Sequence, residues 1–330
     1  MTATMTQCML RLVEEHHTLS DYHGNIAPRW CAGCGDSGIL TAIQRLCRDE
    51  HLPPEKTVFV SGIGCSSRLP HYMNAYGFHG LHGRALPVAE GIRIRRPDLH
   101  VFVITGDGDC CSIGAAHWIH AIRYNMNMTV LLHDNQVYGL TKNQASPTSP
   151  RGMKSNTTPH GTYLDPLNPL TVTLGVANVS FVAQAVDWIP DILYDTIAQA
   201  YRHRGLSFVR ILQRCPEFMN HHFDDALRDP LKTRILVHGD GVRLKPELSR
   251  VYRNQETHDP LDMARALAVA SLTDEIPVGV LYRDPSVPCY EDLREAERPN
   301  TPDLIRTVLD EEFDKVTIWP VAEEAQPGTE

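Results

Sequence analysis

Four short apolar segments recur along the first two thirds of the chain, and each is rich in Val, Ile, Leu or Phe. We expect strands at residues 57–61, 99–105, 128–133 and 207–212. Their apolar positions are continuous rather than alternating, which is typical of strands that helices cover on both faces. Longer segments of helical pattern lie at residues 37–50, 87–96, 112–124 and 189–204. This alternation predicts an α/β fold with a mostly parallel sheet and helices on both of its faces.

Two other regions differ from this pattern. Residues 144–168 are rich in Pro, Ser, Thr and Asn, and we expect a long loop of the kind that often forms a lid or a binding segment. Beyond residue 223 the pattern is looser, with a helix expected at 261–270 and a strand at 277–282. The residues after Asp314 end in a polar sequence and are expected to fray.

The composition is that of an ordinary globular protein, since 42% of the 330 residues are hydrophobic and 22% are charged. This length allows one large domain or two smaller ones. No apolar run approaches the roughly 18–20 residues that a membrane span needs. The N-terminus also lacks the pattern of a secretory signal. We therefore expect a cytoplasmic protein without a membrane partner.

The formal charge of −9 is distributed unevenly along the chain. Residues 1–230 carry 19 basic and 20 acidic side chains, whereas residues 231–330 carry 12 and 20. A nucleic-acid surface requires clustered Lys and Arg, so this balance argues against nucleic acid as a partner. The acidic last hundred residues are most simply interpreted as a solvated surface.

The sequence Gly106-Asp107-Gly108-Asp109 directly follows an expected strand and precedes an expected helix. Asn135 ends the next expected strand, so a βα unit of this size would place Asp107 and Asn135 at neighbouring strand ends. Oxygen ligands at such a site suit Mg²⁺, which commonly bridges to phosphates. A Gly-Asp-Gly sequence alone is more often a simple turn, as we expect for residues 239–241, which have no Asn at similar spacing.

The chain has nine cysteines, and this odd number argues against a disulfide framework. Cys31 and Cys34 form a CxxC motif, Cys65 follows after 30 intervening residues, and Cys215 precedes a proline. Four thiolates suit Zn²⁺ or an iron–sulfur cluster, and the spacing does not separate these two. Alternatively, the CxxC motif is a redox pair and the other two are core residues. The remaining cysteines are expected to be small buried or incidental residues: Cys8, Cys47, Cys110, Cys111 and Cys289.

Several motifs in a fixed order resemble the β subunit of 2-oxoacid:ferredoxin oxidoreductases. They are the CxGCG around Cys31, the GIGCS at residues 62–66, the HGR at residues 82–84, the GDGD, and Asn-Gln-Val-Tyr-Gly-Leu-Thr from Asn135. The resemblance runs from about residue 25 to residue 220. Residues 138–148 are most similar to the 2-oxoglutarate branch, with Asn143 in place of that branch's usual glycine.

The resemblance implies a thiamine diphosphate-binding fold, specifically its diphosphate-binding domain, with one [4Fe–4S] cluster and Mg²⁺. It divides the chain into an N-terminal segment (1–24), this domain (25–230) and an acidic C-terminal extension (231–330). Magnesium would be held by Asp107, Asn135 and the backbone carbonyl of Val137. The cluster would be held by Cys31, Cys34, Cys65 and Cys215. The thiamine cofactor would be lined by Ile63, Gly64, Cys65, Ser66, His82, Gly108, Asp109, Gly139 and Leu140.

The activity implied by the resemblance is oxidative decarboxylation of 2-oxoglutarate with coenzyme A, giving succinyl-CoA and reduced ferredoxin. The reverse reaction would be a reductive carboxylation. Arg68 and Lys142 are candidates for binding the substrate carboxylate, although either could be a surface cation. The catalytic Glu is expected on a partner α subunit that carries the pyrimidine domain, so the predicted assembly is αβ or α2β2.

Three alternatives remain open at this point. The substrate could be pyruvate or another 2-oxoacid. The chain could belong to a non-redox thiamine-dependent decarboxylase or synthase, although such enzymes usually carry both thiamine domains on one longer chain. It could also be a zinc-stabilised binding protein in which Asp107 and Asn135 contact some other phosphate.

Overall fold

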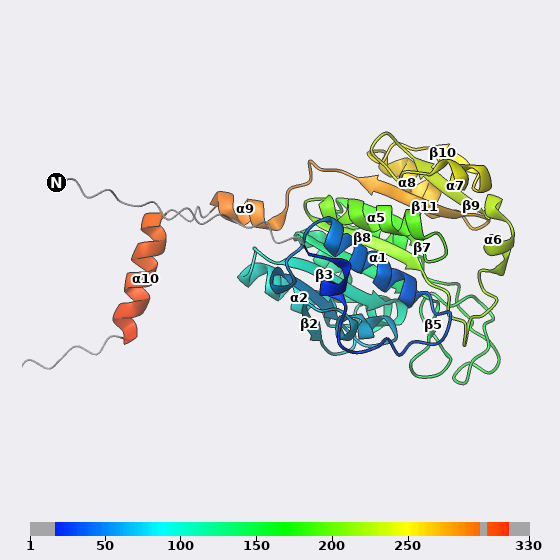
Figure 1. Ribbon diagram of the computed structural model, residues 1–330, viewed down its shortest axis with the longest axis horizontal. Coiled ribbons are helices and arrows are strands. Elements are labelled where there is room, and N and C mark those ends of the chain that lie inside the picture. Colours follow the sequence, from blue (N-terminus) through cyan, green and yellow to red (C-terminus); the bar gives the residue numbers. More distant parts are fainter. Residues whose placement is uncertain (1–16, 298–301, 317–330) are drawn as a thin grey trace, which may run out of the picture. The chain divides into compact units, whose positions relative to one another are not determined.

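The computed structural model describes residues 17–297 and 302–316, and the chain forms two compact units, residues 1–290 and 291–330. The first unit contains a nine-stranded sheet with the order β10-β9-β11-β7-β8-β4-β3-β1-β2 (Figure 1). Its strands are β1 (Thr57–Ser61), β2 (Tyr76–His79), β3 (His100–Gly106), β4 (Met128–Asp134), β7 (Phe181–Val186), β8 (Leu206–Leu212), β9 (Thr233–Val237), β10 (Gln255–Thr257) and β11 (Ile276–Arg283). Neighbours pair in parallel except for β11 and β7. The predicted mostly parallel α/β fold is confirmed.

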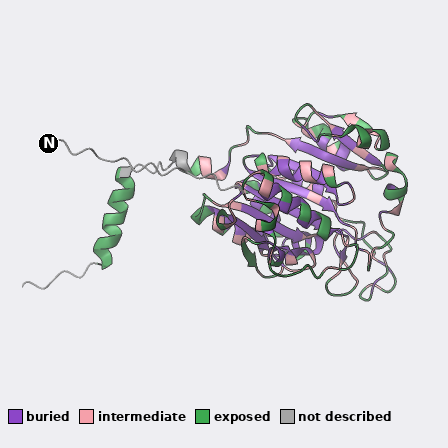
Figure 2. Ribbon diagram, viewed as in Figure 1, coloured by how far each residue is buried: buried purple, intermediate pink, exposed green. Residues whose placement is uncertain are grey.

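Helices cover both faces of this sheet. One face carries α1 (Asp36–Asp49) and α5 (Pro190–Arg202), and the other carries α2 (Ala85–Arg95), α3 (Ala115–Tyr124), α4 (Pro169–Leu174) and α8 (Met263–Ala270). Strand β1 shows how the two layers arise: Phe59 packs into the core beneath α1 and α5, whereas Val58 and Val60 pack into the opposite core. The central strands are therefore buried on both sides (Figure 2), whereas the edge strands β2 and β10 are largely exposed. This explains why the central strands are continuously apolar.

The four strands expected in the first two thirds of the chain are present, with ends that differ by at most one residue. The apolar pattern does not predict β2, β7, β9 or β10. In β7 a polar residue, Gln184, interrupts the apolar run, yet it is buried and its Nε2 donates to the carbonyl oxygen of Pro277 at 2.7 Å. This hydrogen bond to a distant segment satisfies the buried amide group, so the polar residue is tolerated inside the strand. The local sequence pattern gives no sign of this partner.

The helix expected at residues 112–124 begins differently in the structure. A π-helical turn occupies Asp109–Ile113, and the α-helix itself starts at Ala115. The expected loop at residues 144–168 is irregular except for β6 (Gln144–Ala145), which pairs with β5 (Val137–Tyr138). The other short helical segments are Leu19–Tyr22, Pro54–Lys56, Ser66–Tyr72, α6 (Asp224–Arg228), Pro230–Lys232 and α7 (Pro246–Val251).

The expected division at residue 230 does not coincide with a division of the structure, which falls at residue 290. Strands β9, β10 and β11 continue the same sheet beyond residue 230, because β11 pairs directly with β7. The second unit contains most of α9 (Tyr290–Glu297) and all of α10 (Pro302–Val316).

The fraying expected for the residues after Asp314 concerns a segment that lies mostly outside the described residues. Within the described residues, no helix is long and apolar enough to span a membrane.

A buried histidine makes stability depend on pH. His203 follows α5, and its Nε2 lies 2.9 Å from Ser180 Oγ. Burial lowers the pKa of His203 to about 4. Because the unfolded chain binds a proton at higher pH than the folded chain does, stability falls as pH decreases from about 6.5 towards 4, by roughly 3 kcal/mol in total for this group.

We expect His203→Gln to reduce this acid sensitivity, measured by urea unfolding at pH 7 and pH 4.5. His160→Gln, at an exposed loop position, serves as the matched control and should behave like the wild type. Equal acid-induced losses in the wild type and in His203→Gln would contradict the assignment.

Candidate active site

A cavity of about 200 Å³ lies where the segments that follow β1, β3 and β4 meet. The register of β3 and β4 pairs Gly106 with His133, so the two strands end side by side. All nine residues expected around the thiamine cofactor line this cavity, as do Asp107, Asn135 and Val137. The sequence did not indicate four further lining residues: Gly106, His133, Tyr138 and Thr141.

The carboxylate of Asp109 connects the segments that form the cavity. Its Oδ1 accepts hydrogen bonds from the backbone N–H groups of Gly83 at 2.7 Å and Ile63 at 3.1 Å, and from His82 Nδ1 at 2.6 Å. Its Oδ2 accepts one from Thr105 Oγ1 at 2.9 Å. Because these internal donors occupy both oxygens, Asp109 lines the cavity chiefly as the group that fixes its shape.

Two glycines permit the close approach of these segments. A Cβ atom at Gly62 would lie 2.0 Å from Asp109 Oδ2, and one at Gly108 would lie 2.1 Å from the ring of Tyr138. The hydroxyl of Tyr138 donates to the carbonyl oxygen of Gly108 at 3.1 Å, which holds the ring in this place. Any side chain at either glycine would therefore require the backbone or its neighbour to move.

The expected magnesium ligands lie at the ends of two neighbouring strands. Asp107 follows β3 and Asn135 follows β4, and both side chains are buried. Asn135 Oδ1 accepts a hydrogen bond from the backbone N–H of Val137 at 3.2 Å, which turns the chain at this point. The structure thus brings together the three expected metal ligands at one cavity.

Two carboxylates lie next to each other here, with different electrostatic surroundings. Asp134 forms an ion pair with Arg210, in which Nη2 and Oδ2 are 2.6 Å apart. Burial, together with the neighbouring Asp134 carboxylate, raises the pKa of Asp107 to about 7. Thr148, from the long loop, contacts both groups, with its Oγ1 2.8 Å from Asp107 Oδ2 and 2.8 Å from Asp134 Oδ1. A cation at Asp107 would offset the cost of burying its charge.

Hydrogen bonds to backbone carbonyl groups bring the cysteine-bearing segments together. The backbone N–H of Gly35, next to Cys34, donates to the carbonyl oxygen of Arg214 at 3.1 Å. Trp30 Nε1 donates to the carbonyl oxygen of Cys65 at 2.7 Å. These bonds bring Cys31, Cys34, Cys65 and Cys215 into one region.

The pKa of Cys65 is raised to about 12, first by burial and then by nearby Asp36, Cys215 and Cys31. In the described residues, no three His, Cys, Asp or Glu side chains converge closely enough to hold one metal ion.

The other cysteines that the structure describes are buried and form no disulfide: Cys47, Cys110, Cys111 and Cys289. This agrees with their expected role as small buried residues. The expectation for Cys8 concerns a position outside the described residues.

The candidate substrate residues are not among those that line the cavity. Arg68 Nη1 donates to the carbonyl oxygen of Arg29 at 3.3 Å, and its backbone N–H donates to the carbonyl oxygen of Cys65. Lys142 is exposed and has a positive φ of 67°. The structure therefore leaves both roles as predictions.

A buried pair that the sequence did not indicate adjoins the cavity. His133 Nδ1 donates to Asp36 Oδ1 at 2.7 Å, and both side chains are 1% exposed. His133 lines the cavity at the end of β4, whereas Asp36 begins α1 directly after the CxxCG motif. Only the tertiary fold joins these residues, which are 97 positions apart.

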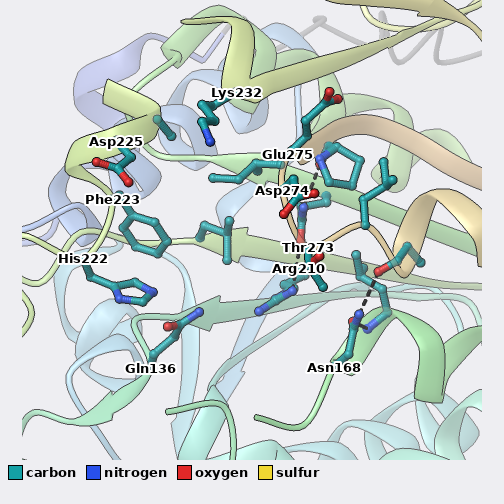
Figure 3. Close-up of a pocket in the computed structure, with 18 residues that line it drawn as sticks. Gln136, Asn168, Arg210, His222, Phe223, Asp225, Lys232, Thr273, Asp274 and Glu275 are labelled. Atoms are coloured by element: carbon teal, nitrogen blue, oxygen red, sulfur yellow. Dashed lines mark hydrogen bonds between the residues drawn. The ribbon is translucent and has the colours of Figure 1, made fainter. Parts of the chain in front are cut away.

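A second cavity, of about 360 Å³, lies next to Arg210, the partner of Asp134 (Figure 3). Gln136 and Arg210 both line it, whereas Asn135 and Val137, on either side of Gln136, line the first cavity. The turn that carries these two expected metal ligands therefore separates the two cavities. Its lining is mixed in charge, because Lys232 and Asp274 also face it. The Arg210–Asp134 ion pair links this cavity to the first one.

The fold and the cavity define a domain of thiamine-dependent enzymes, and comparison with known proteins agrees. Residues 62–211 match the family "thiamine pyrophosphate enzyme, C-terminal TPP binding domain". Residues 248–297 match the family that describes the C terminal of the pyruvate ferredoxin oxidoreductase beta subunit. This second match lies largely within the segment that adds β10 and β11 to the sheet.

The chain belongs to the β subunits of 2-oxoacid:ferredoxin oxidoreductases. It is 35% identical to the β subunit of 2-oxoacid:ferredoxin oxidoreductase 1 of Aeropyrum pernix, over 86% of each chain. It is 45% identical to the 2-oxoglutarate oxidoreductase subunit KorB of Mycobacterium tuberculosis over 67% of this chain, which spans 60% of that relative's length.

A solved structure agrees with this assignment. The 2-oxoglutarate:ferredoxin oxidoreductase of Magnetococcus marinus, with 2-oxoglutarate, coenzyme A and succinyl-CoA bound, matches with a TM-score of 0.75 and 35% identity. The match covers 89% of this chain and 96% of that one.

We expect Gly62→Ala to lower the free energy of unfolding by roughly 1–3 kcal/mol, because its methyl group overlaps Asp109. The same substitution should weaken the binding of thiamine diphosphate. Gly91→Ala is the matched control, because this exposed position in α2 has open space for a Cβ atom. That variant should be unchanged or more stable by about 0.5–1 kcal/mol. Urea unfolding and calorimetric titration measure both effects, and similar behaviour of the two variants would contradict the packing described.

Proposed function

We propose that this chain, together with an α subunit, converts 2-oxoglutarate and coenzyme A to succinyl-CoA and CO₂ and reduces ferredoxin, in a reversible reaction. The observation that carries the proposal is the cavity at the ends of β1, β3 and β4, with its complete set of expected lining residues beside the four cysteine-bearing segments. The expected location is the cytoplasm, and the expected assembly is αβ or α2β2.

The residues present suit thiamine diphosphate with Mg²⁺. Asp107, Asn135 and the carbonyl of Val137 would hold the metal, and the raised pKa of Asp107 is what a buried carboxylate shows before a cation compensates it. Bound thiamine diphosphate supplies an electron sink for decarboxylation of the 2-oxoacid. The chain's own contribution is to hold the diphosphate end in place, with His82 positioned by Asp109 at the cavity wall.

The cysteines suit a [4Fe–4S] cluster as a donor set. Cys31 and Cys34, Cys65, and Cys215 lie on three segments that hydrogen bonds to backbone carbonyl groups join. Cys65 also lines the cofactor cavity, which supports a short path for electrons between the two cofactors. A cluster held by these cysteines would supply one-electron transfer towards ferredoxin.

A partner subunit is supported by the surface near the cavity. Leu81 is 75% exposed beside His82, and Leu140, a lining residue, is 47% exposed. Ile113, at the end of the π-helical turn, is 54% exposed. Exposed apolar side chains next to a site are typical of a surface that another protein covers. The α subunit would supply the catalytic Glu.

The substrate is proposed from relatives and from two cations. The mycobacterial relative is named a 2-oxoglutarate oxidoreductase subunit, and the Magnetococcus enzyme contains bound 2-oxoglutarate. Arg68 lies next to the Cys65 segment and Lys142 next to the lining residue Thr141. A cation near the cavity mouth would favour a substrate with a second carboxylate, such as 2-oxoglutarate, over pyruvate.

We expect Asp107→Ala to abolish the retention of thiamine diphosphate and Mg²⁺ by the purified complex, because the mutation removes a metal ligand. Asp98→Ala, which removes an exposed carboxylate paired with Arg96, should retain both. Cofactor content after gel filtration, measured by fluorescence of oxidised thiamine and by metal analysis, distinguishes the two. Normal content in Asp107→Ala would refute the ligand assignment.

The activity is tested with the αβ complex purified without oxygen. We expect coenzyme A-dependent reduction of a viologen dye with 2-oxoglutarate to exceed that with pyruvate by at least tenfold in kcat/KM. A preference for pyruvate would refute the substrate assignment while leaving the family unaffected.

The same preparation tests the cluster. We expect about four iron and four sulfide per β chain and a broad absorbance band in the visible range. A colourless protein with stoichiometric zinc would refute the cluster and favour the zinc-stabilised alternative.

A further inference from the structure

The sulfur of Cys34 has a buried carboxylate as its neighbour. Asp36 Oδ2 lies 3.7 Å from Cys34 Sγ, and Asp36 Oδ1 accepts a hydrogen bond from His133. Asp36 is fully buried and occupies the first turn of α1, where the helix dipole favours a negative charge. The carboxylate is therefore held in a fixed position beside one of the four proposed cluster ligands.

An amide group lies on the same sulfur atom. Gln213 Nε2 donates to Cys34 Sγ at 3.3 Å and also to the carbonyl oxygen of Arg214. Gln213 is 1% exposed, so this N–H···S contact is shielded from water. One sulfur atom thus has two buried polar neighbours whose electrostatic effects are opposite in sign.

Two buried carboxylates lie near this sulfur, and Asp36 is the one whose charge is not paired with an arginine. Asp187, the other buried carboxylate near the CxxCG motif, is paired with the guanidinium of Arg214 at 3.0 Å. Asp36 instead has an imidazole as its hydrogen-bond partner, and its charge is, after burial, the next cause that raises the pKa of Cys34 and of Cys65. Arg68 acts in the opposite direction on Cys65.

The effect on a cluster follows from Coulomb's law. Reduction of an iron–sulfur cluster adds one negative charge, which a nearby carboxylate disfavours and an N–H donor to a ligand sulfur favours. Both effects are larger in a buried region than in water, because the surroundings screen charge less. A carboxylate would therefore make the cluster a stronger reductant, as a donor to low-potential ferredoxin needs to be.

We propose that Asp36 and Gln213 set the reduction potential of the [4Fe–4S] cluster in opposite directions, with Asp36 lowering it and Gln213 raising it. The proposal rests on the cluster assigned under the proposed function. It makes both side chains positioning residues, which act through the sulfur of Cys34. His133 holds the Asp36 carboxylate in place through its Nδ1–H group.

The test is a redox titration of the anaerobically purified αβ complex, followed by electron paramagnetic resonance. Asp36→Asn keeps the shape of the side chain and removes its charge, so the midpoint potential should become more positive. Gln213→Met removes the N–H donor, so the potential should become more negative. Asp49→Asn is the matched control, because it makes the same substitution at the other end of α1, about 20 Å away at 1.5 Å per residue. It should leave the potential unchanged.

Iron and sulfide content, measured on every sample, separates the possible failures. A wild-type complex without a cluster refutes the proposed function. Variants that keep full iron but show no shift, or shifts opposite to those stated, overturn the present proposal alone. If only one variant loses its cluster, the other variant decides: a shift of its midpoint potential in the stated direction supports the proposal, and a shift in the opposite direction overturns it. Loss of iron from both variants also overturns the proposal, because it would show that these side chains hold the cluster rather than tune it.

Discussion

The active-site cavity depends on one buried carboxylate. Asp109 accepts four hydrogen bonds, from the segment after β1, from the turn that carries His82 and Gly83, and from the end of β3. A carboxylate offers about four acceptor positions, so Asp109 has little capacity left for a ligand. The second aspartate of the GDGD motif is thus a structural connector, and the first one, Asp107, remains available for a cation. Two residues that look equivalent in the sequence have different roles.

Charge compensation distinguishes the carboxylates around the site in a similar way. Asp134 and Asp187 each have an arginine partner, and their charges are balanced within the chain. Asp107 and Asp36 have hydrogen-bond donors instead. Of these four carboxylates, the two without an arginine adjoin the proposed magnesium and iron–sulfur sites, respectively.

The sequence predicts the parts of this site that depend on short spacings. Asp107 and Asn135 could be paired because parallel strands that are neighbours end at the same edge of a sheet. Strand β7 and the Asp36–His133 pair could not be predicted, because each depends on a contact with a residue about 90 or more positions away. The sequence also could not show whether Arg68 and Lys142 line the cavity, because this depends on the direction of their side chains, which residue type and order do not specify.

The hydroxyl of Thr148 has a single proton, yet its oxygen lies 2.8 Å from a carboxylate oxygen on each side. It can donate to only one of them at a time, so Asp107 and Asp134 compete for this hydrogen bond. Burial and the neighbouring Asp134 carboxylate raise the pKa of Asp107 to about 7, so Asp107 takes up a proton at a higher pH than an ordinary carboxylate does. A cation at Asp107 would compete with protons for this carboxylate, so its binding would weaken as the pH falls below about 7. The long loop that carries Thr148 contacts the carboxylate at which this competition would take place.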